Sequence, residues 1–573
     1  MPCKKKILEN SQEKTFRTEN DVIDGYISHA LHKFTKSWRW KAITATKGPF
    51  RSLIKAKVKN LFCLSLKLRN VPNIPFSITW KKILSRLRRI DCQSSHLHMN
   101  LQLFHHAKNL KFCRLKILFR YRRSPVITNN IFVQCYCTKN FRSLILDTMD
   151  HHISGNYDDK LINSLARKTQ IKFLKLLPPL FFNFQKNNDK MILGLKKLVK
   201  LDSLSITSLN RFSENTHTSL EVSLQRLQNL QCVSLKFDDW ERKSPGYLKI
   251  FNCLQKKENL KSIEYIISGS KIKEEIPVSD FVTVFVSISK PNLLNLHLHI
   301  DSLFISKVHL LLLLANIHNC HSLRSFEIKF SSIGTLKLDE EIFEKLGNFL
   351  ISLSAIEDFS LKYSTIPFER SEKLYQILKK MRPLSSLSLD IECMAKNMVE
   401  LESISEFLES QSHLKKLHFT LNQSYVGSNY WIVPNSWKII MKGFEKLEKL
   451  EDLHINLGQA REFPVKSMKS AVGAMLAKMK NLKSLNLVLH LSMVYDSEVN
   501  QLIRALKKLS RLSSLFLGID LTHLNKNTID NFTNFVKQIN YQEFGFNLVH
   551  YDKKYSDLTE ALNQAITRVE AKI

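Results

Sequence analysis

The chain has 573 residues, 44% of them hydrophobic, so it is several times longer than an ordinary domain and can bury a large core. Lys and Arg total 86 against 52 Asp and Glu, for a formal net charge of +34, and the apolar content excludes wholesale disorder. Only 14 glycines and 14 prolines occur, which favours one regular array over several domains on flexible linkers.

The positive charge is concentrated in the first third of the chain. Residues 1–200 hold 40 Lys and Arg against 11 Asp and Glu, a net charge of +29. Residues 201–573 hold the remaining 46 and 41, a net charge of +5. This asymmetry predicts an acidic partner for the first third: nucleic acid, an anionic membrane face or an acidic protein.

Residues 1–55 are predicted to form a basic N-terminal cap or tail. The polar residues after Met1-Pro2-Cys3-Lys4-Lys5-Lys6 leave no apolar core for a signal peptide. The longest apolar block, Leu310–Ala315, is far too short to span a membrane. The ten cysteines contain no C-x-x-C pair, which is typical of a reducing compartment. We therefore expect a cytoplasmic or, alternatively, nuclear protein without a transmembrane segment.

A phrase of the form L-x-x-L-x-L-x-Φ, where Φ is apolar, recurs along most of the chain. Residues 56–200 are predicted to hold basic, degenerate copies, which begin at Leu61, Leu87, Phe112, Phe141 and Ile171. Residues 201–540 are predicted to hold regular copies, which begin at Leu201, Leu230, Leu260, Leu293, Leu323, Ile356, Leu384, Leu414, Leu450, Leu482 and Leu512. A last degenerate copy at Tyr541 and a C-terminal cap make up residues 541–573. So steady a period indicates an array of structural repeats.

Each copy predicts one strand followed by one helix. Positions four, six and eight of the phrase are apolar and alternate with polar residues, which is the pattern of a strand with one buried face. The apolar residues between phrases follow a helical period, as in the series Val499, Leu502, Ile503, Leu506 and Leu509. Neither apolar face can be buried within one copy, so stacked copies must bury both.

This pattern resembles the leucine-rich-repeat superfamily, and its period is similar to the long, ribonuclease-inhibitor-like class. The resemblance implies an α/β solenoid, a horseshoe or arc with a parallel inner β-sheet and outer helices, of about 15 repeats of roughly 30 residues. The family's Asn or Cys at position ten has no regular counterpart, since the residues after the alternating part, such as Asp301, Ser331 and Glu392, share no type. The turn after each strand is therefore expected to be irregular.

The resemblance also implies that partners bind on the concave face, which the outward strand residues would line. Positions five and seven are polar, mixed in sign and rich in histidine. The candidate partner-binding residues there are His297, His299, Glu327, Lys329, Lys362, Asp390, His418 and His454. Because half-exposed strand residues are polar by default, an unspecific solvated surface is the alternative interpretation.

A second candidate is the aromatic insertion between Leu421 and the helix near Ser436. Exposed aromatic side chains often anchor interfaces. The candidate residues are Tyr425, Tyr430, Trp431 and Trp437. They could instead fold the loop back onto the edge of the solenoid.

Two basic clusters in the first third are candidate polyanion-binding sites. They comprise Lys81, Lys82, Arg86, Arg88, Arg89, Arg120, Arg122 and Arg123. The first cluster has the pattern of a cationic amphipathic helix, which could be a calmodulin target or a nuclear-localisation signal. Because the period places a phrase at Leu87, we favour a repeat helix with solvated charges.

No residue can be singled out as catalytic, cofactor-binding or metal-binding. The nucleotide-binding, hydrolase and metalloprotease motifs are absent, and the histidines near Cys92, Cys113 and Cys320 match no zinc spacing. The sequence therefore favours a non-catalytic protein-binding scaffold or adaptor. The alternative is a protein that binds RNA or another polyanion through residues 1–200, and an enzyme or enzyme regulator ranks last.

Overall fold

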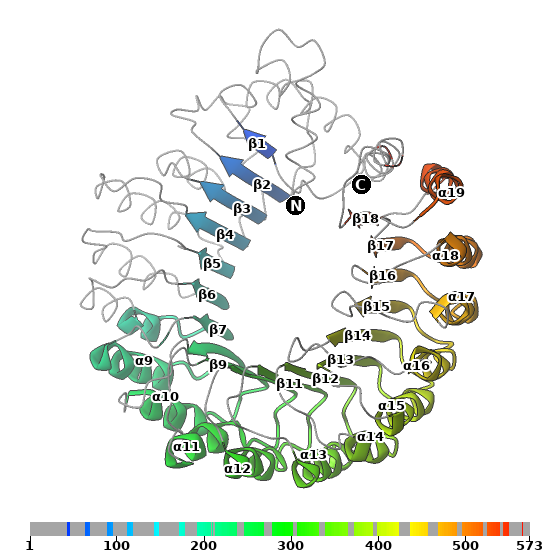
Figure 1. The fold of residues 1–573 in the computed structure, drawn as a ribbon. Coiled ribbons are helices and arrows are strands. Elements are labelled where there is room, and N and C mark those ends of the chain that lie inside the picture. The colour runs from blue at the N-terminus through cyan, green and yellow to red at the C-terminus, as the bar shows by residue number, and fades with distance from the viewer. Residues whose placement is uncertain are drawn as a thin grey trace. The chain divides into compact units, whose positions relative to one another are not determined.

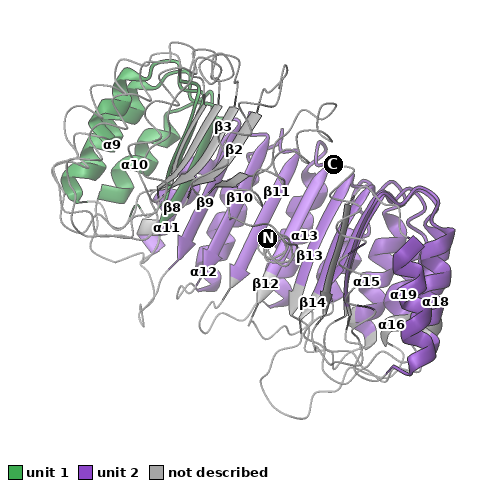
Figure 2. Cartoon of the chain, turned by 90° about the horizontal axis from the view of Figure 1, so that it is seen from above, with its two compact units in different colours: residues 1–260 green, residues 261–573 purple. Residues whose placement is uncertain are grey.

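The structure is a computed structural model of the full chain. It describes residues 43–45, 63–68, 89–94, 112–117, 143–147, 171–177, 192–207, 209, 213–237, 246–268, 278–301, 306–331, 339–364, 372–392, 398–422, 436–456, 468–489, 496–519, 524–538, 543–548, 558 and 564. The chain divides into two compact units, residues 1–260 and residues 261–573, which Figure 2 draws in green and purple. Each unit is described by itself.

Unit 1, residues 1–260, pairs its strands in sequence order. The strands are β1 (Ile43–Ala45), β2 (Cys63–Leu68), β3 (Arg89–Ser94), β4 (Phe112–Ile117), β5 (Ser143–Asp147), β6 (Phe173–Leu177), β7 (Ser203–Ile206) and β8 (Cys232–Phe237). Each strand is parallel to the next along the chain. The described helices of this unit are η2 (Leu195–Lys197), α9 (Glu214–Arg226) and α10 (Gly246–Gln255).

Unit 2, residues 261–573, alternates strand and helix without interruption. Its strands are β9 (Ser262–Ser268), β10 (Asn295–Asp301), β11 (Ser325–Ser331), β12 (Asp358–Ser364), β13 (Ser386–Glu392), β14 (Lys416–Asn422), β15 (Asp452–Asn456), β16 (Ser484–Leu489), β17 (Ser514–Ile519) and β18 (Glu543–Leu548). Its helices are α11 (Val278–Ile288), α12 (Lys307–Ile317), α13 (Glu340–Ser352), α14 (Glu372–Leu378), α15 (Met398–Ser410), α16 (Ser436–Phe444), α17 (Met468–Lys478), α18 (Asp496–Lys508) and α19 (Lys526–Gln538). All neighbouring strands are parallel, and the helices lie on the outer side of the strands (Figure 1).

The core lies between the strands and the helices of each repeat. Positions four and six of each regular phrase, such as Leu485 and Leu487 in β16, are buried with at most 3% exposure. The apolar stripe predicted on α18 is buried as well, from Val499 to Leu509. One repeat cannot bury the apolar faces of its own strand and helix. Stacking of neighbouring repeats buries both faces and thereby stabilises the array.

The repeats are joined by a regular backbone ladder at the start of the strands. In each repeat of unit 2 from β10 to β17, two consecutive amide groups donate to one carbonyl of the preceding repeat. In β16, for example, Lys483 and Ser484 both donate to the Glu451 carbonyl, with N···O distances of 2.7 and 3.0 Å. The same arrangement joins Gln231 and Cys232 to Asp202 in unit 1. This ladder holds corresponding phrase positions in register.

The predicted fold class is confirmed as an α/β repeat solenoid with parallel strands and outer helices. From β7 to β18 the described residues contain twelve strands, at a spacing of roughly 30 residues. One phrase needs correction, because Cys113 is in register with Ile90, which places the start of that copy at Leu110 and not at Phe112. The boundaries proposed at residues 55, 200 and 540 stay predictions.

Candidate partner-binding face

The polar positions of neighbouring strands in unit 2 form one continuous surface. We call it the inner face: the side chains at phrase positions five and seven of β9–β17, which point away from the helices. The parallel register places His297 beside Glu327 and then Ser360, Ser388, His418 and His454, all at position five. It likewise places His299 beside Lys329 and then Lys362, Asp390, Thr420 and Asn456, all at position seven. Every inner-face residue predicted from the sequence therefore lies in one of two rows.

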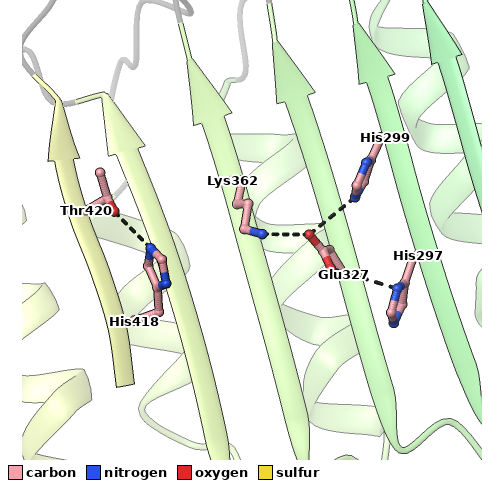
Figure 3. A network of polar contacts seen from close by, with 6 residues as sticks. All are labelled: His297, His299, Glu327, Lys362, His418 and Thr420. Atoms are coloured by element: carbon pink, nitrogen blue, oxygen red, sulfur yellow. Dashed lines mark hydrogen bonds and ion pairs between the residues drawn. The ribbon is translucent and has the colours of Figure 1, made fainter. Parts of the chain in front are cut away.

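Glu327 on β11 is the centre of an ionic cluster on this face (Figure 3). Its Oε1 atom accepts a hydrogen bond from Lys362 Nζ at 2.8 Å and lies 3.2 Å from His299 Nε2. Its Oε2 atom lies 3.8 Å from His297 Nδ1. Side chains from β10 and β12 thus contact one carboxylate on β11. The Glu327 side chain is only 18% exposed.

The neighbours of Glu327 favour its charged form. The contact with His299 is the main cause that lowers the pKa of the Glu327 carboxyl to about 2, with Lys362 adding to the effect and partial burial opposing it. The carboxylate is therefore ionised throughout the physiological range. It holds Lys362 and His299 in fixed directions on the surface.

His418 on β14 and His454 on β15 form a stacked pair. Their ring centroids are 3.9 Å apart and their planes are inclined by 8°. His418 Nε2 also lies 3.1 Å from the hydroxyl of Thr420, two residues further along the same strand. Burial lowers the pKa of His418 to about 4, and the nearby His454 adds to that shift. Burial also lowers the pKa of His454.

A neutral, flat imidazole pair therefore lies a few strands from the charged cluster. Neutral rings can accept or donate hydrogen bonds and can pack against apolar groups. The inner face thus offers two different chemical surfaces on one rigid sheet.

Sequence reasoning missed the apolar end of this face. Position five of β17 is Phe516, which is in register with Asn486 and with Gly545. Position seven is Val488 on β16 and Gly518 on β17. The side chains of Phe516 and Val488 are half-buried, so part of each contacts solvent. Phe516 could have been predicted, because it is the fifth residue of the phrase that begins at Leu512.

The other sequence-predicted residues lie mostly outside the described part of the chain. Tyr425, Tyr430 and Trp431 are outside it, and Trp437 is described only as a backbone position in α16. Of the basic residues, only Arg89 has a described backbone, as the first residue of β3. The residues outside are Lys81, Lys82, Arg86, Arg88, Arg120, Arg122 and Arg123.

The described residues have three further properties that bear on function. No group of three or more His, Cys, Asp or Glu side chains among them could hold a metal ion. The thiols of Cys253 and Cys320 are free and buried, and burial raises the pKa of both. None of the described helices is both long enough and apolar enough to cross a membrane.

Neither a family model nor a curated protein matches this chain. Among solved structures, it is similar to a chain in the crystal structure of the Rad7 and Elc1 complex in yeast. The two sequences are 13% identical, and the similarity covers 75% of this chain and 80% of that chain with a TM-score of 0.37. Similarity at this level says nothing about what this chain binds, so its function has to be inferred from its own residues.

Proposed function

We propose that this protein is a non-catalytic scaffold that binds a protein partner on the inner face of residues 261–573. The observation that carries the proposal is the continuous double row of outward side chains in parallel register across β9–β17. Neighbouring strands lie about 4.8 Å apart, so the rows form a wide surface held by the backbone. Side chains fixed in this way lose little conformational entropy when a partner binds.

The charges of the inner face favour a protein over a polyanion. Acidic residues are interspersed with basic ones, so a chain of phosphates would meet repulsion at several points. The acidic members are Glu264, Glu327 and Asp390, and the basic ones are Lys329 and Lys362. Asp358 and Lys416 lie at position three, on the same side of the sheet. A polypeptide with both signs of charge can complement such a surface.

Three finer assignments belong to the same proposal. The repeats are of the ribonuclease-inhibitor-like class, since their steps of roughly 30 residues fit its long unit. The protein acts in the cytoplasm or the nucleus. Tyr425, Tyr430, Trp431 and Trp437 supply further contacts to the partner. Replacing Trp431 and Trp437 by alanine should then weaken partner capture at nearly unchanged melting temperature, whereas a large fall in melting temperature would assign both residues to packing.

The charge asymmetry of the sequence favours a second candidate function, RNA or polyanion binding by residues 1–200. The excess of 40 basic over 11 acidic residues there is its support. Replacing Arg120, Arg122 and Arg123 by glutamine should lower affinity for RNA and flatten its salt dependence. An unchanged salt slope would remove this cluster from consideration.

The inner-face proposal is tested by capture of the tagged full-length protein from its native extract, with and without nuclease. Ser388 is a half-buried position-five residue near the middle of the face, so Ser388→Arg places a bulky charge in the contact area. Asn348→Arg adds the same group to the exposed side of α13 and serves as the control. We expect nuclease-resistant partners that Ser388→Arg loses and Asn348→Arg retains. Partners lost with nuclease, or retained by Ser388→Arg, would contradict the proposal.

A further inference from the structure

Lys329 on β11 is the middle residue of a row of three basic side chains. It is in register with His299 on β10 and with Lys362 on β12, all at phrase position seven. Side chains at matched positions of adjacent strands lie about 5 Å apart at their Cβ atoms. One anionic group placed above the row can therefore reach all three.

The outer two members of the row already have an anionic partner, whereas Lys329 has none among the residues that the structure describes. Lys362 Nζ and His299 Nε2 both contact Glu327 Oε1, at 2.8 and 3.2 Å. Lys329 is half-buried and makes no hydrogen bond or ion pair with any residue that the structure describes. Glu327 cannot readily serve it as well, because its Oε1 atom already has two partners and Oε2 faces His297 at 3.8 Å.

We propose that Lys329 is the anchor for an acidic side chain, an Asp or Glu carboxylate, of the protein segment that docks on the inner face. The inference rests on the proposed function and names the chemistry of its partner. Glu327 acts as a positioning residue, because its contacts hold Lys362 and His299 on either side of β11 while leaving the Lys329 ammonium available. The bound carboxylate then accepts hydrogen bonds from Lys329 and, at the sides, from its neighbours.

The charges around the row favour a single carboxylate in a mixed-charge segment. Asp390 continues the position-seven row beside Lys362, and Asp358 lies at position three of β12 on the same side of the sheet. These acidic groups would repel a continuous run of acidic residues or a nucleic-acid backbone. The matching segment therefore carries one acidic side chain with basic or neutral neighbours.

The test uses a random peptide library displayed on phage and panned over the immobilised full-length protein, with the Ser388→Arg variant as counter-selection. Peptides that bind the wild type and not Ser388→Arg are inner-face peptides, and we expect them to be enriched in Asp and Glu relative to the unselected library. The counter-selection removes acidic peptides that bind the basic first third, because that region is the same in both proteins.

Affinities of the best synthetic peptides then decide the role of Lys329. Lys329→Gln should weaken binding about tenfold, the effect of one well-placed charge pair. Lys379→Gln is the matched control, since it removes the same charge from an exposed residue just after α14, where Lys379 Nζ lies 3.0 Å from Glu406. Replacing the acidic residue of the peptide by Gln should weaken its affinity for the wild type by the same factor. The same replacement should not weaken its affinity for Lys329→Gln any further, because the charge pair is already lost there.

Two outcomes would overturn the anchor. In the first, inner-face peptides bind Lys329→Gln as tightly as they bind the wild type. In the second, replacing the acidic residue of the peptide by the corresponding amide leaves its affinity for the wild type unchanged. Either result would leave the inner-face function standing, because those peptides still require an unblocked Ser388. A library that yields no peptide distinguishing wild type from Ser388→Arg would contradict both the anchor and the proposed function.

Discussion

His418 and His454, which lie 36 residues apart in the sequence, stack face to face across strands β14 and β15 with ring centroids 3.9 Å apart. Protonating His418 would place a charge in a partly buried site against another imidazole, which explains its pKa of about 4. The pair therefore links the stability of the sheet to pH.

We expect the pair to make folding less stable as the pH falls from about 6.5 to about 4. A histidine whose folded-state pKa is lowered binds its proton more readily in the unfolded state. The free energy of unfolding is therefore unaffected by this histidine above pH 6.5 and decreases as the pH falls below 6.5. Between pH 6.5 and pH 4, the free energy of unfolding should fall by on the order of 1 kcal/mol less in His418→Gln than in the wild type, allowing for solvent screening at a half-exposed ring. Denaturant unfolding at a series of pH values measures it, with exposed His413→Gln as the control. Parallel pH profiles for the wild type and His418→Gln would contradict the prediction.

Glu327 should contribute to stability with a pH dependence of the same sign as that of His418, but in a lower pH range. Its pKa of about 2 lies below the unfolded value near 4.5, so its stabilising effect is complete above pH 4.5 and disappears as the pH falls through 2. Glu327→Gln should cost about 2 kcal/mol at pH 7, because Lys362 and His299 then lose a shared ionic partner. Glu357→Gln is the control, since its contact with Arg324 is long, 3.7 Å, and exposed. It should cost less than about 0.5 kcal/mol. Equal unfolding midpoints for the two variants would refute the structural role of the cluster.

Two glycines in neighbouring helices should respond in opposite ways to alanine. A Cβ atom at Gly443 in α16 would lie 2.7 Å from the Ser405 carbonyl oxygen and 2.9 Å from its Cα atom, and backbone atoms cannot move aside easily. Gly443→Ala should therefore destabilise by about 1–3 kcal/mol. At Gly473 in α17 the nearest atom would be 3.6 Å away, so Gly473→Ala should be neutral or stabilising by up to about 1 kcal/mol. Thermal unfolding of both variants checks this, and a stable Gly443→Ala protein would mean that α15 and α16 pack less closely.

In unit 1, Lys257 should stabilise the end of a neighbouring helix. Its buried ammonium donates to the carbonyls of Gln225 and Leu227 at 3.1 and 3.2 Å, where α9 ends. Lys257→Met keeps the apolar stem but leaves two carbonyl groups without that donor, so we expect a loss of about 1–3 kcal/mol. Lys256→Met, at the exposed neighbouring position, should have little effect on chemical denaturation. Equal free energies of unfolding for Lys257→Met and Lys256→Met would show that water hydrogen-bonds to the two carbonyl groups in place of the ammonium.

The phrase positions predicted most of the inner face because corresponding residues of successive repeats stack in register. His297, Glu327 and Lys362 were identified as outward residues on that basis. Their contacts could not be predicted, because two contacts join position five of one strand with position seven of its neighbour and depend on side-chain rotamers. Lys257 was missed for a different reason. A lysine is expected to be exposed, and only the end of the adjacent helix makes its burial favourable.

Site-specific photo-crosslinking in the full-length protein tests the central claim most directly. A photoreactive amino acid is placed at Ser388 on the inner face or at Asn348 on the outer side of α13, and native extract is irradiated with each protein. Protein adducts that form at residue 388, survive nuclease and are absent at residue 348 are the predicted result. Adducts of equal yield at both positions, or nucleic acid as the crosslinked species, would contradict a protein-binding inner face.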